Sequence, residues 1–177
     1  MPTATYEHIT TTTITGSATS TVDFTSITSA FTDLKLVIQA KASADGDIIY
    51  CRLNNDSTSG NYLWGYVTLF GNGTTTNSGV SNRGASQTYG MISWDACPNT
   101  DGQNLISITH FNNYSDTSKY KTFLTRTGSN KGSNYNGTEI IISEWASTSA
   151  INRITLTLST TTFAIGSKFS LYGIKAS

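Results

Sequence analysis

Residues that could perform acid–base or metal chemistry are scarce in this chain. Of its 177 residues only two are histidines, His8 and His110, and each lies in an alternating apolar and polar pattern typical of a β-strand. His110 shares its side of that strand with Ile106 and Ile108, so we expect a hydrogen-bonded histidine within a sheet. No spacing of His, Cys and Asp resembles a zinc site, and the sequence has no nucleophile elbow and no nucleotide-binding glycine motif. The sequence therefore predicts no metal and no cofactor.

Acidic residues offer a second route to catalysis, because glycosidases use two carboxylates on facing elements about 5–9.5 Å apart. Most candidate acids lie in predicted loops, with Glu139 and Glu144 in a predicted strand. Glu144 precedes Trp145, and a carboxylate beside an aromatic ring suits a sugar, so both residues are candidates for a carbohydrate site. The simpler alternative is that Glu144 is an outward-facing strand charge. With so few convergent carboxylates, the sequence predicts that the protein is not an enzyme and offers no catalytic residue.

Two loops are rich in the oxygen ligands that calcium prefers. They are residues 45–47 (Asp-Gly-Asp) and residues 54–58 (Asn-Asn-Asp-Ser-Thr). Neither loop has the spacing or the carboxylate count of an EF-hand, so both are predicted to be turns.

The two cysteines are Cys51 and Cys97. Cys51 lies on the side of a predicted strand that also carries Ile49 and Leu53, which favours a buried free thiol. A disulfide between Cys51 and Cys97 stays open as an alternative, because the sequence does not fix the distance between them.

The most informative segment is residues 61–70, which reads as a strand with two different apolar faces. One face carries leucine and valine, and the other carries four aromatic rings. A solvated face should not carry four rings, because each buries about 150–250 Å² when it is covered. The cover could be a second layer of the same chain, a neighbouring subunit or a flat ligand such as a sugar. Because interface cores are rich in aromatics and poor in charge, we take four residues as candidates for a subunit interface or ligand surface: Tyr62, Trp64, Tyr66 and Phe70.

The charge content argues against several classes of partner. The formal net charge is +0 and only 12% of residues are charged, so the chain lacks the basic footprint of a nucleic-acid-binding protein. No apolar run approaches the ~20 residues of a membrane helix, and the N-terminus lacks the features of a secretory signal. We therefore expect a soluble protein made in a cytoplasm, with neither nucleic acid nor membrane as a partner.

The hydrophobic pattern has a period of two throughout, which indicates strands. In residues 33–41, for example, Leu34, Leu36 and Ile38 fall on one face and polar residues on the other. Turn-forming Asn-Gly and Asp-Gly pairs separate the segments, and no convincing helix is present. The predicted strands are residues 6–14, 21–27, 33–41, 47–53, 62–70, 87–94, 104–112, 120–127, 139–145, 151–158 and 168–174.

Short strands with frequent turn signals favour a sandwich or a barrel. No linker, charge block or clear internal repeat divides the chain, so residues 1–177 are predicted to form one domain. The predicted fold class is all-β, an antiparallel jelly-roll-like β-sandwich of about ten strands.

Several segments in order resemble a family of small virion structural proteins of tailed phages, particularly phages of aquatic bacteria and cyanobacteria. Residues 31–38 resemble a "YTDLRLVI" strand, and residues 166–174 resemble a closing "GSTFSLYGI" strand. One departure is Asn55, where the family pattern has glycine. The likeness runs nearly end to end and also includes residues 4–9, residues 53–62 ("RFNGDTGSNY") and residues 145–151 ("W-x-STAAI").

This resemblance implies a location in the virion and no catalytic residues. The leading hypothesis is a capsid decoration (cement) protein that packs against the major capsid protein or other virion proteins, with a homotrimer as the expected self-assembly. The alternative is a tail-fibre or receptor-binding module that recognises a host surface glycan. A free-standing lectin or glycoside hydrolase is a third reading, which the sparse carboxylates disfavour.

Overall fold

The computed structural model describes residues 5–44, 47–71, 77–131 and 136–175. Within these ranges the regular elements are all strands and no helix is present. The strands are β1 (Tyr6–Thr13), β2 (Thr21–Phe24), β3 (Asp33–Ala40), β4 (Asp47–Leu53), β5 (Tyr62–Gly71), β6 (Asn77–Gln87), β7 (Gly90–Cys97), β8 (Leu105–Phe111), β9 (Lys121–Asn130), β10 (Asn136–Trp145), β11 (Ile154–Leu158) and β12 (Lys168–Ile174).

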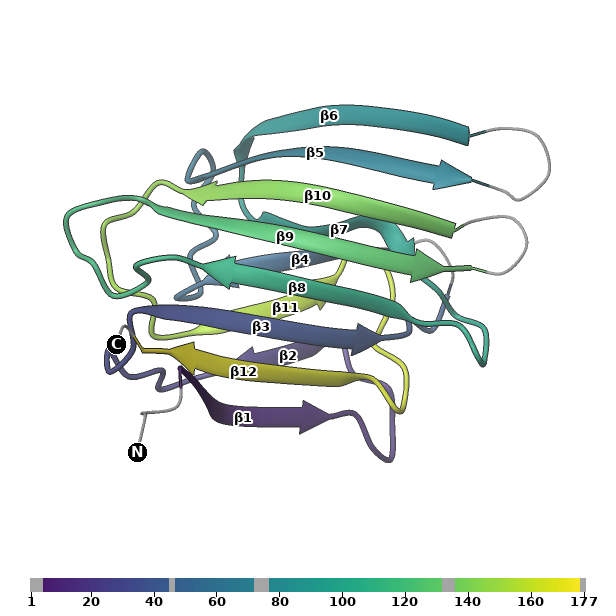
Figure 1. The fold of residues 1–177 in the computed structure, drawn as a ribbon, viewed down its shortest axis with the longest axis horizontal. Helices are drawn as coiled ribbons and strands as arrows, with labels where there is room; N and C mark the ends of the chain where they lie inside the picture. Colours follow the sequence, from purple (N-terminus) through teal and green to yellow (C-terminus); the bar gives the residue numbers. More distant parts are fainter. Residues whose placement is uncertain (1–4, 45–46, 72–76, 132–135, 176–177) are drawn as a thin grey trace.

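The strands form two antiparallel sheets that face each other (Figure 1). The larger sheet has eight strands in the order β1-β12-β3-β8-β9-β10-β5-β6, and the smaller has four in the order β2-β11-β4-β7. The first half of the large sheet and the whole small sheet have the strand order of an eight-stranded jelly roll. Two hairpins, β5–β6 and β9–β10, extend the large sheet beyond that unit. The all-β sandwich is therefore confirmed, whereas the expected count of about ten strands was too low, because the described chain has twelve.

The strand that the sequence pattern missed is β6. It carries one large aliphatic side chain, Val80, and is otherwise built from small and polar residues. It is an edge strand of the large sheet and, within the described residues, pairs with β5 alone, so it has little need of an alternating apolar pattern.

The main core lies between the two sheets. Leu34, Leu36 and Ile38 on β3 are fully buried there, as their alternation predicts. Cys51 and Cys97 are both buried and no disulfide joins them, so the thiol expectation for Cys51 holds and the disulfide alternative does not. Burial raises the pKa of the Cys51 thiol, which keeps it protonated.

A buried carboxylate fixes the loop that follows β11. Asp47 is 3% exposed, and its oxygens accept backbone N–H bonds from Ile48 (2.8 Å), Ser159 (3.0 Å) and Thr161 (2.9 Å), with a longer one from Thr160 (3.3 Å). Burial alone would raise the pKa of Asp47, but these bonds and those from the Ser159 and Thr161 hydroxyls outweigh it and hold the pKa below its ordinary value. Both carboxylate oxygens are therefore occupied by the protein's own donors.

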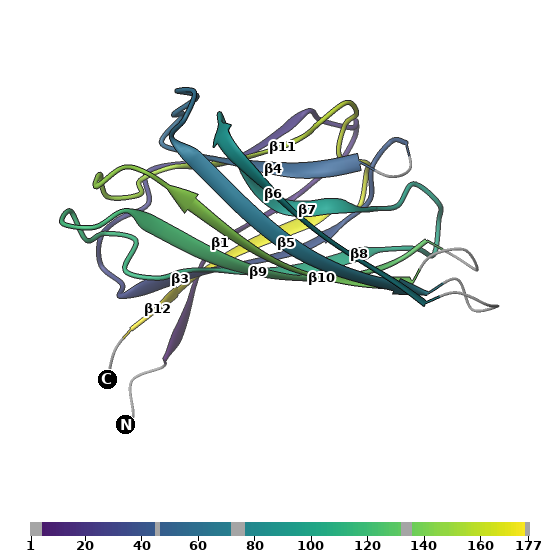
Figure 2. The ribbon, with the colours of Figure 1, turned by 90° about the horizontal axis from the view of Figure 1, so that it is seen from above.

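The small sheet covers the inner face of the large one unevenly. Seen from above, β5 and β6 cross diagonally from the level of the small sheet to that of the large sheet (Figure 2). β7 is the strand of the small sheet that lies against β8, β9, β10 and β5. Ser143 on β10 helps to hold it, because its hydroxyl bonds both the N–H (3.0 Å) and the carbonyl (3.3 Å) of Met91. The inner face of the extension is thus covered by β7 of the same chain.

Candidate interaction surface

The aromatic face of β5 points into the sandwich. Tyr62 is fully buried, and its hydroxyl accepts a hydrogen bond from the Leu53 N–H at 2.9 Å. Tyr66 is 4% exposed and belongs to a second apolar cluster with Met91 and Ile141. Of the three covers considered for this face, the chain's own second layer therefore encloses these two rings.

Trp64 joins the same inner cluster and is half-buried. Its ring lies 6.0 Å from that of Tyr66 and 6.2 Å from that of Trp94 on β7, measured between centroids. The ring also rests on Gly84 of β6, where a Cβ would lie 2.3 Å from the indole. Phe70, further along β5, is also half-buried. The four aromatic candidates thus lie on the inward face, with only Trp64 and Phe70 reaching solvent.

The carbohydrate candidates Glu144 and Trp145 point to opposite faces of β10, as neighbours on a strand must. Trp145 is 2% exposed, and its Nε1 donates to the Asp56 carboxylate at 2.7 Å. Burial tends to raise the pKa of Asp56, but the bonds from Trp145 and Asn61 lower it to about 2. The indole face is therefore not open to a sugar, and Glu144 stands alone on the outer face, half-exposed.

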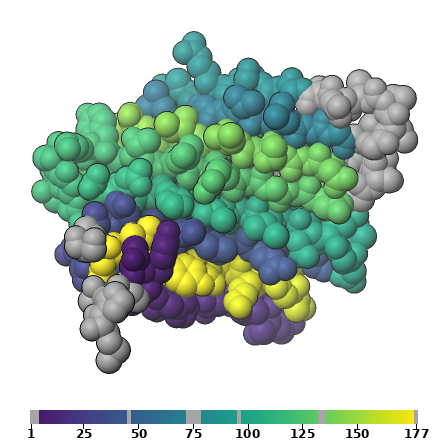
Figure 3. All heavy atoms as spheres, in the orientation of Figure 1, coloured from purple at the N-terminus to yellow at the C-terminus, as the bar shows by residue number. Residues whose placement is uncertain are grey.

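The large sheet carries an extensive apolar surface on its outer face, the side away from the small sheet. Seven aliphatic side chains there are between 41% and 57% exposed. We call this set the outer aliphatic patch, and Figure 3 looks directly onto the face that carries it. It comprises Leu63, Val67 and Leu69 of β5, Ile140 and Ile142 of β10, Leu124 of β9 and Ile106 of β8.

The strand register places several members of the patch side by side. Val67 lies directly opposite Ile140 across the β5–β10 ladder, and Ile142 lies opposite Leu124 across the β10–β9 ladder. Cross-strand neighbours of this kind have Cβ atoms about 4.5–5.5 Å apart, so their side chains touch. The largest exposed apolar patch on a soluble protein is often functional, and patches larger than a few hundred Å² mark interaction sites.

Charge is almost absent from the patch. Arg126 on β9 is exposed, and the register places it between Ile108 on β8 and Ile140 on β10. Glu144 lies at the edge of the patch, opposite Leu63, and shares a shallow hollow with Arg83 of β6. Neither Arg126 nor Glu144 makes an ion pair within the described residues. Arg83, Arg126 and Glu144 therefore stand on this part of the face without an ion pair among the described residues.

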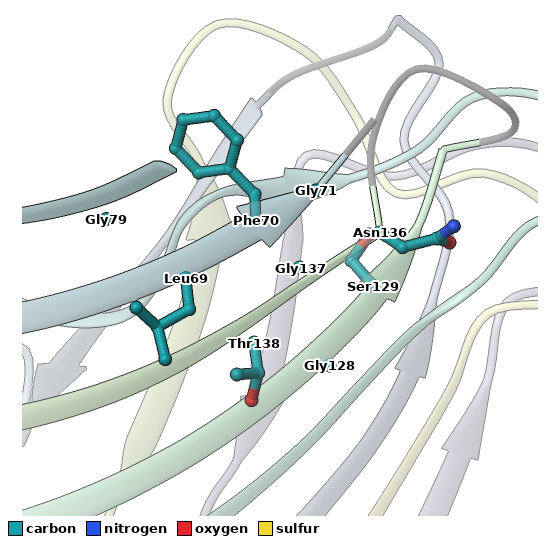
Figure 4. A pocket seen from close by; sticks show the side chains of 9 residues that line it. All are labelled: Leu69, Phe70, Gly71, Gly79, Gly128, Ser129, Asn136, Gly137 and Thr138. Atoms are coloured by element: carbon teal, nitrogen blue, oxygen red, sulfur yellow. The ribbon is translucent and has the colours of Figure 1, made fainter. Parts of the chain in front are cut away.

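A wider hollow lies at one end of the patch (Figure 4). Leu69 and Thr138 project from neighbouring strands on its side, whereas Phe70 points the opposite way. Gly79 and Gly128 lie in the same lining, so part of it is bare backbone. Its lining residues include no acid, base or nucleophilic thiol, so the hollow suits apolar contact rather than chemistry.

The histidines do not form a chemical site. His8 is exposed and its Nε2 lies 2.8 Å from the Thr11 hydroxyl. His110 is on the outer face, as Ile106 and Ile108 are, but its buried Nε2 has no hydrogen-bond partner, so the expected bond is missing. Burial first, and then nearby Lys35 and Arg126, lower its pKa and favour the neutral ring. Among the described residues no three His, Cys, Asp or Glu side chains gather as metal ligands would.

The calcium-ligand loops divide between described and undescribed residues. In the first loop, residues 45–46 lie outside the described residues, and both carboxylate oxygens of Asp47 already accept hydrogen bonds from the backbone. In the second, Asp56 accepts bonds from Thr58 N–H (2.9 Å) and Asn61 (2.7 Å) and closes a turn, as expected. Asn54 and Asn55 have positive φ there, which Asn tolerates better than most residues.

Comparisons with protein-family models, with curated proteins and with solved structures find no match for this chain. Fold and surface alone therefore define the class: a jelly-roll β-sandwich with an apolar outer sheet face. No helix in the described residues is long and apolar enough to cross a membrane.

The sequence reasoning identified the leucine and valine face of residues 61–70 but missed the rest of the outer patch, although a second signal for it was present. Residues 140–142 are three consecutive isoleucines, so both faces of that strand are apolar. Only Ile141 points inward, which leaves Ile140 and Ile142 on the outer face.

Proposed function

We propose that this protein is a structural component of a tailed-phage virion, most specifically a capsid decoration protein that works by packing against other subunits. Its proposed location is the virion surface, and its proposed partners are the major capsid protein and further copies of itself. It performs no chemistry in this role.

The observation that carries the proposal is the outer aliphatic patch. A freely soluble enzyme or lectin gains nothing from seven half-exposed aliphatic side chains on one sheet, whereas a subunit of an assembly buries them. The jelly-roll fold, which recurs in viral capsid domains, and the ordered sequence resemblance support the same role. Because fold alone does not determine function, the patch carries more weight than the topology.

Copy number in purified virions tests this proposal. Quantitative mass spectrometry of intact particles should find hundreds of copies of this chain per particle. A dozen copies or fewer would place it on a tail, and its absence from the particles would overturn the proposal.

A second candidate, the receptor-binding module, is favoured by a different part of the outer face. Tyr6 and Tyr172 line a hollow with Lys35 and Val37, and Tyr6 is 50% exposed. The Lys35 ammonium lies 5.0 Å from the centre of the Tyr6 ring. Exposed rings beside a donor can stack on and hydrogen-bond a sugar.

A glycan array separates this candidate from decoration. Specific binding that Tyr6→Ala abolishes while the protein stays folded would favour the receptor-binding module. Failure to bind any glycan at high protein concentration would leave decoration as the better account.

A further inference from the structure

We propose that β6 pairs edge to edge with β6 of a second copy of this chain, antiparallel and about a two-fold axis at Ser81, so that the two large sheets join into one. The inference rests on the proposed function in taking further copies of this chain as a partner, and it names the strand through which two copies associate. Two observations carry it: the state of the four sheet edges and the direction of the β6 backbone.

Two of the four sheet edges are protected by their shape against pairing with another strand. At the far edge of the large sheet, the register of β1 with β12 is interrupted by a bulge between His8 and Thr10. At one edge of the small sheet, β2 is only four residues long. Bulges and short edge strands are devices by which natural proteins prevent edge-to-edge pairing.

The other edge of the small sheet, β7, is bonded by side chains of its own chain. The Ser143 hydroxyl on β10 bonds both the N–H (3.0 Å) and the carbonyl (3.3 Å) of Met91. The Trp94 N–H donates to the Glu139 carboxylate, also on β10, at 3.1 Å. A strand from another molecule would therefore find these backbone groups already in use.

Between Asn77 and Gly84, β6 has none of these protections within the described residues. It is eleven residues long, forms an edge of the large sheet (Figure 1), and keeps an unbroken register with β5 over this stretch. It contains no proline and a single charged residue, Arg83. Because the protective devices of an edge act against copies of the same edge, an edge without them permits pairing with itself.

The backbone of β6 directs alternate residues toward the free edge. The Arg83 N–H donates to the Asn82 side chain at 2.7 Å, and the Ala85 carbonyl accepts a bond from the Gln87 side chain at 2.9 Å, so these two groups do not serve the ladder with β5. Since alternate residues of an antiparallel strand bond to the same neighbour, Ser81 also directs its N–H and carbonyl to the free edge. Through such groups a second strand adds to a sheet.

A two-fold axis at Ser81 makes the edge complementary to itself. Ser81 then lies opposite Ser81 of the second copy, and Arg83 of each copy lies opposite Gly79 of the other, where the missing side chain leaves room for the arginine. The two arginines are four residues apart along the strands, about 13 Å, which exceeds the Debye length of about 8 Å at physiological ionic strength. An axis at Asn82 would bring them within about 7 Å of each other along the strands.

The pairing occupies both free edges at once and gives a closed pair. The two large sheets become one sheet of sixteen strands, eight from each copy. A two-fold axis perpendicular to the sheet leaves the outer aliphatic patches of both copies on the same face. The pair therefore keeps both patches available for another virion protein.

This pairing differs from the homotrimer that the family resemblance favours, and the two predict different masses. The chain has a mass of 19.0 kDa, so a pair has twice that mass and a trimer three times. Sedimentation equilibrium of the purified full-length protein at micromolar concentration should give the mass of a pair. A monomer or a trimer would overturn the pairing.

Ser81→Lys tests the position of the axis. Ser81 is exposed, and the substitution places two lysines opposite each other, so it should weaken self-association roughly tenfold. Thr10→Lys is the matched control, because Thr10 is exposed on β1 at the opposite edge of the same sheet and the added charge is the same. The control should pair as tightly as the unaltered chain, and equal losses in the two variants would overturn the proposed contact.

Cysteine cross-linking tests the register without adding charge. In Ser81→Cys the two new cysteines face each other with Cα atoms about 5.5 Å apart, within the range of a disulfide, so oxidation should join the copies covalently. The native Cys51 and Cys97 are buried and should add little background. Ala85→Cys is the control on the same strand, because its two cysteines would lie about 26 Å apart. Equal cross-linking of the two variants, or none in Ser81→Cys, would overturn the pairing.

The pairing and the proposed function fail in different experiments. A chain that is a monomer in solution yet abundant in virions would refute the pairing and keep the proposed function. A cross-linked pair in solution from a chain that is absent from virions would do the reverse.

Discussion

Asp47→Asn should destabilise the protein strongly, because Asp47 uses both carboxylate oxygens inside the fold. One oxygen faces the N–H groups of Ile48 and Ser159, and the other faces those of Thr160 and Thr161. An asparagine can keep one acceptor but presents an NH₂ group to the other pair of donors. Two backbone N–H groups then lose their acceptor at about 1–3 kcal/mol each, which gives a loss of about 2–6 kcal/mol.

The assay is urea or thermal unfolding at neutral pH. For a chain of this length about 2–4 °C is lost per kcal/mol, so a loss in the middle of that range lowers the midpoint by about 8–16 °C. Asp101→Asn is the matched control, since Asp101 is exposed and pairs only with Lys41, and its midpoint should not move. An Asp47→Asn protein whose free energy of unfolding lies within about 1 kcal/mol of that of the unaltered protein would refute the reasoning.

Three further predictions follow from the same contacts. Trp64→Ala should cost about 2–3 kcal/mol of folding stability without changing self-association, because the ring packs against Trp94 of the same chain. Unfolding curves measure the first effect and sedimentation measures the second. Gly84→Val should also destabilise the fold, since a Cβ there would collide with the Trp64 ring, and the same unfolding assay measures the loss. Stability should fall as the pH drops from about 4 toward 2, because the folded pKa values of Asp47 and Asp56 are below the unfolded value of about 3.9. The two carboxylates stabilise the fold fully above about pH 3.9 and lose that contribution as they become protonated. An unfolding midpoint that does not change over this acid titration would count against the prediction.

Much of the fold could be predicted from alternation because one face of most strands is apolar. β3 shows this plainly: Leu34, Leu36 and Ile38 alternate with half-buried or exposed residues and all point into the core. β6 could not be found in this way. An edge strand needs only backbone pairing on one side, and its sequence of Ser, Asn and Gly leaves no periodic signal.

The interaction surface could be predicted only in part, and β5 shows why. Both of its faces are apolar, so alternation separates Tyr66 and Trp64 from Val67 and Leu69 without saying which pair points inward. That choice depends on β7, which belongs to the other sheet and places Trp94 against the rings. The larger rings fill the inner space, and the smaller aliphatic side chains are left outside.

Adjacent residues gave a misleading cue at the end of β10. Glu144 and Trp145 suggested a sugar site because they are neighbours in sequence, yet neighbours on a strand point to opposite faces. The structure places Trp145 in the core beside Asp56 and leaves Glu144 on the outer face. The alternation of side chains along a strand therefore predicts that Glu144 and Trp145 cannot belong to the same site on one face.

A reconstruction of the assembled virion is the measurement that bears most directly on the central claim that the outer sheet face is an assembly surface. We predict that the outer face of β5, β9 and β10 lies against another subunit, with Val67, Ile140 and Leu124 covered. The account is contradicted if these three side chains face open solvent in the particle.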